Sequence, residues 1–364
     1  MHKDLRDCYW FEGLSDQLVA RPSLDGTVNA DVAIIGAGYT GLWTAYHLTQ
    51  LDPALSVVIL EAEHVGFGAS GRNGGWLMGS IEGLDKYLAP CDEQLRAAGF
   101  REVHGIPASA GEIIRREGIE CDFAHGGAIY AAARYPEQLS MAKAHLDSLR
   151  AAGHGEKDYR WLDAAELETH ARISGARGAI FTPNVAAIQP AKLATGLAKA
   201  AERHGVRICE HSRVLDALPG ELCTASGSVK APVIIAAMEG YGSDLMSMHH
   251  HILPFQSGMV ATEPLSATVW EEIGFHRRPV LADYSRLSTY MHRTADDRLV
   301  FGARGSYRFG GKPISHFDVD DRAFASRRAL ARQFFPVLEN ATFTHAWGGT
   351  LGISRRFAPH VAFD

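Results

Sequence analysis

Short apolar runs alternate with amphipathic stretches along much of the chain. Residues 32–35 and 57–60 are entirely apolar and 229–237 nearly so, which is typical of strands buried on both faces of a parallel sheet. Residues 136–152 and 190–204 instead carry apolar side chains at helical spacing. This alternation of buried strands with helices predicts an α/β layer.

A second pattern dominates the later part of the chain. Residues 259–262, 288–293 and 299–302 are short strand-like segments, and Asp296-Asp297 offers a hairpin turn between the last two, so antiparallel sheet is expected. Residues 126–130 form a similar segment earlier in the chain. Because the two patterns interrupt one another, the chain is predicted to thread an α+β unit through the α/β layer.

The first predicted strand leads into a nucleotide-binding pattern, Gly36-Ala37-Gly38-Tyr39-Thr40-Gly41, and the second strand ends in Glu61. Gly36 permits a tight turn, Gly38 lets the backbone approach a pyrophosphate, and Gly41 lets the helix pack on the sheet. The phosphate charge would lie at the positive end of that helix. Glu61 suits a ribose hydroxyl and disfavours a 2′-phosphate. The pattern alone fits NAD as well as FAD, and also a glycine-rich loop of an unrelated α/β domain.

Half of residues 66–75 are glycine, in the order Gly-Phe-Gly-Ala-Ser-Gly-Arg-Asn-Gly-Gly. Each glycine fixed in regular structure costs about 0.5–1 kcal/mol relative to alanine. A segment with this many glycines therefore needs them for a specific reason. This second glycine segment is therefore expected to adopt unusual dihedral angles or to approach a ligand.

Composition narrows the class of protein. A chain of 364 residues is long enough for two domains, and its net charge of −6 gives no electrostatic reason to expect a nucleic acid as partner. No apolar stretch has the length of a membrane span, and the charged start lacks a signal region. The five cysteines are odd in number and form no C-x-x-C pair, so free thiols and a cytoplasmic location are expected. No metal site is predicted, because the run His249-His250-His251 has no acid or cysteine cluster beside it and is interpreted as a loop.

Taken together, five segments resemble the FAD-dependent amine and amino-acid oxidoreductases of the D-amino-acid oxidase superfamily, most closely the branch that includes gamma-glutamylputrescine oxidase. The second glycine segment is the most specific of them, because an unrelated NAD enzyme does not need it. The segments are 31–61; 68–75; Pro190 with its helix and Val214; 233–240 followed by Leu253-Pro254; and 347–349.

The resemblance implies a Rossmann-like α/β FAD-binding domain of the glutathione-reductase type, with an inserted α+β substrate domain built on an antiparallel sheet. In this division the N-terminal arm carries an aromatic cluster that packs on the body. The expected boundaries are 1–27 for the arm; 28–85, 160–242 and 340–364 for the discontinuous FAD-binding domain; and 86–159 and 243–339 for the substrate domain.

The resemblance also implies which residues hold FAD. Arg72 would neutralise phosphate or bond the flavin, the alternative being a solvated surface arginine; Val214 would contact the adenine through its backbone, or be an ordinary strand residue. Noncovalent binding is expected, because relatives that tether FAD use a cysteine near the C-terminal flavin segment or a histidine in the second glycine segment, and neither is present. The implied cofactor-binding residues are Gly36, Gly38, Tyr39, Thr40, Gly41, Glu61, Ala62, Ala69, Ser70, Arg72, Asn73, Gly74, Gly75 and Val214.

In such enzymes an amine C–H delivers a hydride to the flavin, the resulting imine is hydrolysed, and O2 or another acceptor reoxidises the flavin. No catalytic dyad is required once the amine is unprotonated. Tyr290 matches the strand tyrosine that lines the substrate pocket of D-amino-acid oxidases, and Trp347 would wall the flavin pocket. His345 would face the same pocket. The alternatives are an aromatic residue packed in a sheet for Tyr290, a core tryptophan for Trp347 and a hydrogen-bonded structural histidine for His345.

Two departures from the family pattern shape the functional prediction. Leu351 and Arg356 hold the positions at which glycine and D-amino-acid oxidases have a carboxylate-clamping arginine and an aspartate. Since leucine cannot pair with a carboxylate, an amine substrate is favoured over an α-amino acid. Family members also continue past Asp364 with a strand, a glycine-rich turn and a helix, so a fragment or a natural truncation is expected.

Three hypotheses remain at this point. The first is an FAD-dependent oxidoreductase acting on the CH–NH bond of an amine, such as a polyamine derivative. The second is an amino-acid or sarcosine-type oxidase whose substrate carboxylate is held by Arg72, Arg293 or Arg304. The third is a noncatalytic remnant that binds nucleotide.

Overall fold

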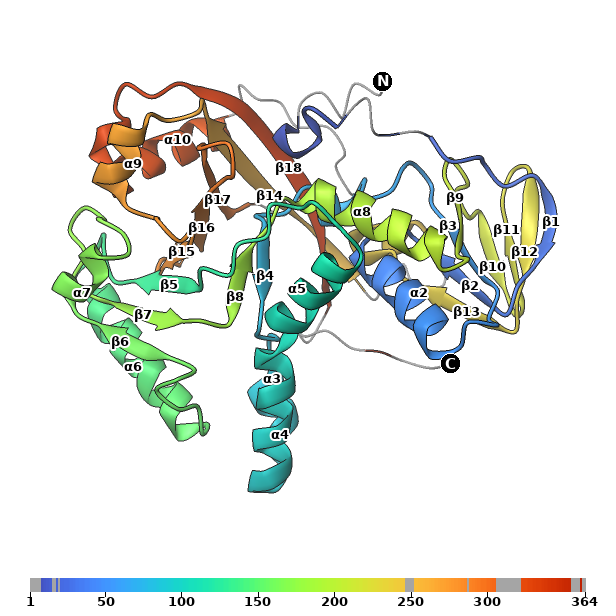
Figure 1. The fold of residues 1–364 in the computed structure, drawn as a ribbon, viewed down its shortest axis with the longest axis horizontal. Coiled ribbons are helices and arrows are strands. Elements are labelled where there is room, and N and C mark those ends of the chain that lie inside the picture. Colours follow the sequence, from blue (N-terminus) through green and yellow to red (C-terminus); the bar gives the residue numbers. More distant parts are fainter. Residues whose placement is uncertain are drawn as a thin grey trace.

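A computed structural model describes residues 8–14, 18, 20–245, 252–286, 288–305, 322–354 and 361, which form two sheet-based layers that lie side by side (Figure 1). Long strands and a group of short helices occupy the junction between the layers. Within this part of the chain, no helix combines the length and apolar character needed to cross a membrane.

A four-stranded parallel sheet of order β13-β2-β3-β9 forms the centre of one layer. Val32 and Ile34 face the covering helices, whereas Ala33 and Ile35 face a second sheet, because side chains alternate along a strand. Burial on both faces explains why these strands are apolar throughout. The strands are β2 (Val32–Ile35), β3 (Val57–Leu60), β9 (Arg207–Cys209) and β13 (Val233–Ala236), and the helices are α2 (Tyr39–Leu51) and α8 (Pro190–Arg203).

A second four-stranded sheet, of order β1-β12-β11-β10, covers the other face. Leu222 and Val229 of this sheet share a core with Val58 of the parallel sheet. The prediction of one strand over 229–237 was wrong, since Pro232, which has no N–H to donate, separates two strands that belong to different sheets. The covering strands are β1 (Gly26–Asn29), β10 (Asp216–Leu218), β11 (Glu221–Cys223) and β12 (Gly227–Lys230).

The other layer is an eight-stranded sheet of order β18-β14-β17-β16-β15-β5-β7-β6. All its pairs are antiparallel except β5 with β15. The hairpin expected at Asp296-Asp297 joins β16 to β17, and Asp297 has a φ of 63°. The strands are β5 (Ala128–Ala131), β6 (Arg160–Leu162), β7 (Ala179–Thr182), β14 (Ile252–Thr262), β15 (Val280–Asp283), β16 (Thr289–Arg293), β17 (Leu299–Arg304) and β18 (Phe343–Ser354).

Helices and short elements complete both layers. Side chains of α9 and α10 share the core of the eight-stranded sheet, whereas Ile114 of α5 joins the core of the parallel sheet. The small β4-β8 pair lies next to the second glycine segment. These elements are α3 (Leu84–Leu88), α4 (Glu93–His104), α5 (Ile106–Arg116), α6 (Glu137–Ala151), α7 (Ala164–Glu168), α9 (Ala267–Ile273), α10 (Arg322–Phe334), β4 (Trp76–Met78), β8 (Val185–Ala187), η1 (Tyr9–Phe11), η2 (Ala69–Gly71), η3 (Glu239–Asp244) and η5 (Pro336–Leu338).

The path of the chain revises the expected boundaries in two places. Strands β6 and β7 fall within 160–242 but pair in the eight-stranded sheet, and β18 falls within 340–364 but forms the edge of the same sheet. In both cases pairing between segments distant in sequence decides the partner, and local composition does not reveal it. Both segments therefore belong with the eight-stranded sheet.

The aromatic cluster of the N-terminal arm was expected to pack on the body, and it lies between the two layers. Trp10 is 1% exposed, and its indole N–H donates to the carbonyl of Asn73 at 2.8 Å. Its ring contacts Trp347 edge to face at a centroid distance of 5.7 Å. Trp10 is thus part of the core and fastens the second glycine segment.

Replacing Trp10 by alanine is expected to lower the free energy of unfolding by about 3–5 kcal/mol, because a large buried side chain is removed. Denaturant titration followed by circular dichroism measures this loss. Leu95→Ala is the control, since Leu95 is 56% exposed and its loss should change stability by less than about 0.5 kcal/mol. Equal stability of W10A and the wild type would contradict the assigned packing.

Candidate active site

The turn between β2 and α2 needs glycine at the three predicted positions, for three different reasons. Gly36 has a φ of 104°, and a Cβ there would lie 2.6 Å from the carbonyl oxygen of Ala237. A Cβ at Gly41 would lie 2.1 Å from the carbonyl oxygen of Gly36, so no side chain fits between the helix and the turn. A Cβ at Gly38 would lie 3.0 Å from the Ser70 hydroxyl oxygen. Gly38 and Ser70 both line a cleft.

That cleft, of about 130 Å³, lies at the N-terminus of α2. Gly38 caps the helix without a side-chain hydrogen bond, and the Ser70 hydroxyl accepts the Tyr39 N–H at 2.8 Å. The backbone N–H groups at the start of α2 suit a pyrophosphate. Of the predicted cofactor residues, the cleft is lined by Gly36, Gly38, Tyr39, Thr40, Glu61, Ala62, Ala69, Ser70 and Val214.

Glu61 directly follows β3 and lines this cleft. One carboxylate oxygen accepts the Ala37 N–H at 2.8 Å and the other accepts the Glu63 N–H at 2.9 Å. Burial raises the pKa of Glu61, and the two backbone N–H groups oppose that shift because they favour the ionised form. Each oxygen keeps lone pairs for further donors, as a ribose diol requires.

The second glycine segment is rich in glycine partly because other side chains lie very close to its backbone. A Cβ at Gly74 would lie 2.8 Å from the Tyr290 ring, and one at Gly75, which has a φ of 72°, would lie 2.6 Å from Nε2 of His292. Asn73 holds the segment in shape, since its amide donates to the Ser70 carbonyl at 2.8 Å and its side-chain oxygen accepts the Gly75 N–H at 2.8 Å. The unusual dihedral angles expected here are present at Gly66 and Gly75.

Arg72 lies in this segment and is 5% exposed, so the interpretation as a solvated surface arginine was wrong. Its Nε donates to the Phe67 carbonyl at 2.8 Å and its guanidinium lies 5.2 Å from the Phe67 ring centroid. Nη2 is buried with no hydrogen-bond partner. Because buried donors are almost always partnered, this nitrogen points to a ligand acceptor, which fits a flavin or its phosphates.

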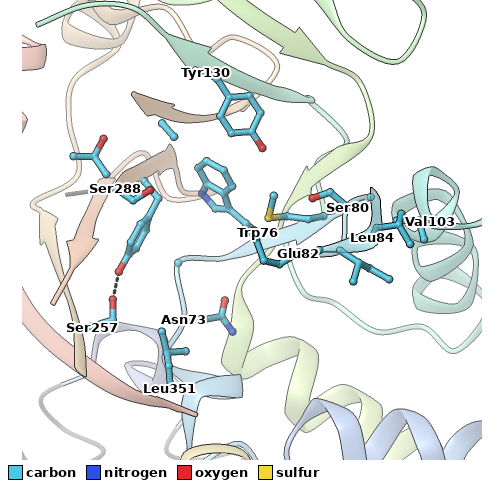
Figure 2. A pocket seen from close by; sticks show the side chains of 18 of the residues that line it. Asn73, Trp76, Ser80, Glu82, Leu84, Val103, Tyr130, Ser257, Ser288 and Leu351 are labelled. Atoms are coloured by element: carbon cyan, nitrogen blue, oxygen red, sulfur yellow. Dashed lines mark hydrogen bonds between the residues drawn. The ribbon is translucent and has the colours of Figure 1, made fainter. Parts of the chain in front are cut away.

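A larger cavity of about 660 Å³ adjoins the cleft, and Ala69 lines both. Arg72, Asn73 and Gly74 form one part of its wall, and Tyr290 of β16 and Leu351 of β18 reach it from the eight-stranded sheet (Figure 2). The Tyr290 hydroxyl is hydrogen-bonded to that of Ser257 in β14. The cofactor residues and the predicted substrate tyrosine therefore meet at one junction.

Trp347 and His345 do not line this cavity as the structure describes it. Trp347 is 1% exposed and its indole N–H donates to the Arg72 carbonyl at 3.1 Å, so it supports the second glycine segment from behind. His345 Nε2 lies 3.2 Å from the Glu12 carboxylate, and its ring packs on Tyr9. The structural interpretations of both residues fit their positions better than the catalytic ones.

Other candidates lie elsewhere. Arg293 is bonded to Asp297 at 2.8 Å and stacks on the Trp270 ring, outside the cavity lining, so it does not hold a substrate carboxylate there. The side chain of Arg304 and the residues 249–251 and 355–356 lie outside what the structure describes.

Sequence reasoning missed several lining residues. Trp76 and Met78 lie on β4. Tyr130 lies on β5, within the segment 126–130 that was expected to form a strand, and lines the cavity. Ser257 and Met259 come from β14. The apolar triplet directly after Gly75 was a usable signal for β4, whereas nothing local marks Tyr130 or Ser257.

Comparisons with known proteins agree with this geometry. Residues 31–363 match the family described as FAD dependent oxidoreductase, DAO. The chain is 30% identical over 362 residues to "Probable oxidoreductase OrdL" of Haemophilus influenzae, covering 97% of this chain and 80% of that protein. It is also 30% identical to the gamma-glutamylputrescine oxidoreductase of Escherichia coli, covering 90% of this chain and 75% of that one.

The fold is shared with a solved structure, the glycine oxidase of Geobacillus kaustophilus. The TM-score is 0.73 at 22% identity, over 92% of this chain and 85% of that chain. Since the family match spans most of the sequence and includes both glycine segments, the protein belongs to the DAO family of FAD-dependent oxidoreductases.

Proposed function

We propose that this oxidoreductase acts on the CH–NH bond of an amine bound in the 660 Å³ cavity. The observation that carries the proposal is that Ala69 lines both the cleft at the start of α2 and a cavity lined mostly by apolar and aromatic groups. FAD, when bound, supplies the hydride acceptor. The chain supplies the binding surface, the orientation of the amine and the exclusion of water.

The charges around the cavity favour an amine over an α-amino acid. Leu351, at the position where the resemblance places a carboxylate-clamping arginine, lines the cavity. Among the described lining residues Arg72 is the one arginine or lysine, whereas Glu82 and Asp85 add carboxylates. Carboxylates together with the Trp76 and Tyr130 rings suit a cationic group remote from the reacting nitrogen.

Tyr290 and Ser257 are the proposed positioning pair for the reacting amine. Their hydroxyls are hydrogen-bonded to each other across β17, which lies between β16 and β14 in the sheet, and this bond fixes the tyrosine ring. A nitrogen donor or acceptor of the substrate can bond to either hydroxyl. Both residues lie on strands, and a site on rigid elements holds a substrate more precisely than one on loops.

The second candidate is an amino-acid or sarcosine-type substrate. One observation favours it: the unpartnered Nη2 of buried Arg72, which can pair with a carboxylate as well as with FAD. Holoenzyme mixed anaerobically with γ-glutamyl or N-alkyl derivatives of putrescine is expected to bleach at its flavin band, with little bleaching by glycine, sarcosine or D-alanine. Preferential bleaching by the amino acids would establish the second candidate, and a colourless chain that takes up no FAD would favour a noncatalytic remnant.

We also propose that FAD is bound noncovalently, that O2 or another acceptor reoxidises it, and that the protein works in a reducing cytoplasm. None of the five cysteines lines the cleft or the cavity described above. Acid precipitation of the holoenzyme is therefore expected to leave the yellow flavin in the supernatant. Yellow colour in the washed pellet would show a covalent bond.

A further inference from the structure

Three potential metal ligands meet at the end of the cavity that lies away from the glycine segments. They are His104, the last residue of α4, and His154 and Asp158 from the loop after α6. Val103, next to His104, lies across the cavity from Ser257 (Figure 2). One ligand atom from each of the three side chains lies within 4.8 Å of the other two.

His154 carries an independent indication of a ligand. The residue is 7% exposed and lines the cavity, yet its Nδ1 is buried with no hydrogen-bond partner. Its Nε2 lies 3.7 Å from Asp85, an arrangement that favours the proton on Nε2 and leaves a lone pair on Nδ1. A buried lone pair without a donor is uncommon in native structures, and a metal ion is one partner that satisfies it.

The donor set and the surroundings suit a transition-metal ion. Two imidazoles and one carboxylate are typical zinc ligands, with bonds of about 2.0–2.2 Å. His104 Nδ1 already lies 3.3 Å from Asp158 Oδ1, close to the spacing of two ligands on one ion. The His154 ring is held by Phe100, at a centroid distance of 4.1 Å, and by Tyr159, at 5.3 Å.

We propose that His104, His154 and Asp158 form a binding site for a divalent transition-metal ion, with Zn²⁺ the best match to the donors. The ion joins the end of α4 to the loop after α6 and closes this end of the cavity. Its fourth ligand is water, since Asp85 lies at Nε2, on the other side of the His154 ring. The ion lies in the cavity proposed for the amine, but its ligands are assigned without reference to the identity of the substrate.

The test uses the holoenzyme, purified without a histidine tag and treated with a chelator. Isothermal titration with Zn²⁺ is expected to give a single equivalent per chain and a higher melting temperature that EDTA reverses. Co²⁺ is expected to give d–d absorption at wavelengths longer than the flavin bands. His154→Gln, His104→Gln and Asp158→Asn should each abolish the Co²⁺ signal, with flavin content and circular dichroism as checks on folding.

Two controls make the result specific. His145→Gln removes another histidine of the same cavity, whose Nδ1 bonds the Tyr284 hydroxyl at 2.8 Å, and should leave Co²⁺ binding unchanged. Glutamine at His249, His250 and His251 removes a competing histidine run and should also preserve the signal. The proposal is overturned if the wild type gives no Co²⁺ spectrum, or if binding survives in Asp158→Asn and in whichever histidine variants fold. In that case the cluster is a histidine–aspartate ion pair that anchors α4.

Discussion

A valine at Gly38 is expected to weaken flavin binding strongly while leaving the fold intact. Gly38 has a φ of −84° and a ψ of −177°, which any residue can adopt, so the substitution does not strain the backbone. Its Cβ would point toward the Ser70 hydroxyl, 3.0 Å away, and the branched side chain would fill the cleft at the start of α2 that is proposed to hold the pyrophosphate. We expect FAD affinity to fall at least about 100-fold, equivalent to roughly 2.7 kcal/mol.

Fluorescence titration of the apoprotein with FAD measures this loss, and thermal unfolding of the apoprotein checks the fold. Leu51→Ala is the matched control, because Leu51 lies on the same helix at its far end and is 83% exposed. The variant L51A should bind FAD normally. Unchanged affinity in G38V would remove the pyrophosphate from this cleft, whereas loss of the apoprotein fold would assign Gly38 a packing role.

Replacing Arg72 by methionine is expected to lower kcat/KM by about 10- to 150-fold, the equivalent of one lost charged hydrogen bond of about 1.5–3 kcal/mol. The methionine keeps the buried apolar stem but loses the Nε bond to Phe67 and the unpartnered Nη2 that points to a ligand. Arg72→Lys should be impaired as well, because an ammonium group cannot reproduce the planar fork.

Steady-state kinetics and flavin content together show whether Arg72 contacts the cofactor or the substrate. Loss of FAD affinity in R72M assigns the guanidinium to the cofactor, whereas full FAD content with a raised KM assigns it to the substrate. Arg115→Met, at an exposed position of α5, is the control and should behave as the wild type. Wild-type kinetics in R72M would show that the buried guanidinium serves packing alone.

The geometry of the cleft at the start of α2, which is proposed to hold the dinucleotide, was largely predictable from sequence, because its determinants are local. Gly36, Gly41 and Glu61 act through a turn, a helix contact and a strand end that lie within 30 residues of one another, and each part has a recognisable residue type. The strands at 32–35 and 57–60 were predicted with the bounds that the structure has, since burial on both faces leaves an apolar run.

The cavity was harder to predict because its wall is assembled from segments distant in sequence. Tyr130, Ser257 and Leu351 come from three strands of one sheet, and β6 and β7 join that sheet through pairing that local composition does not specify. The opposite error occurred at Trp347, where the family pattern suggested a pocket wall but the side chain points into the core. Spacing places a residue on a strand, but packing decides which side of the strand it occupies.

Two indole N–H groups hold neighbouring carbonyls of the second glycine segment, one from Trp10 and one from Trp347. The acceptor at Arg72 and its donor are 275 positions apart. During synthesis the cleft at the start of α2 can form once β13 has emerged. The contact between Trp347 and the Arg72 carbonyl forms only after β18 has been made and has paired with β14. We therefore expect the parallel sheet and its cleft to fold first in a nascent chain. The second glycine segment should be fixed in its final position among the last steps of folding.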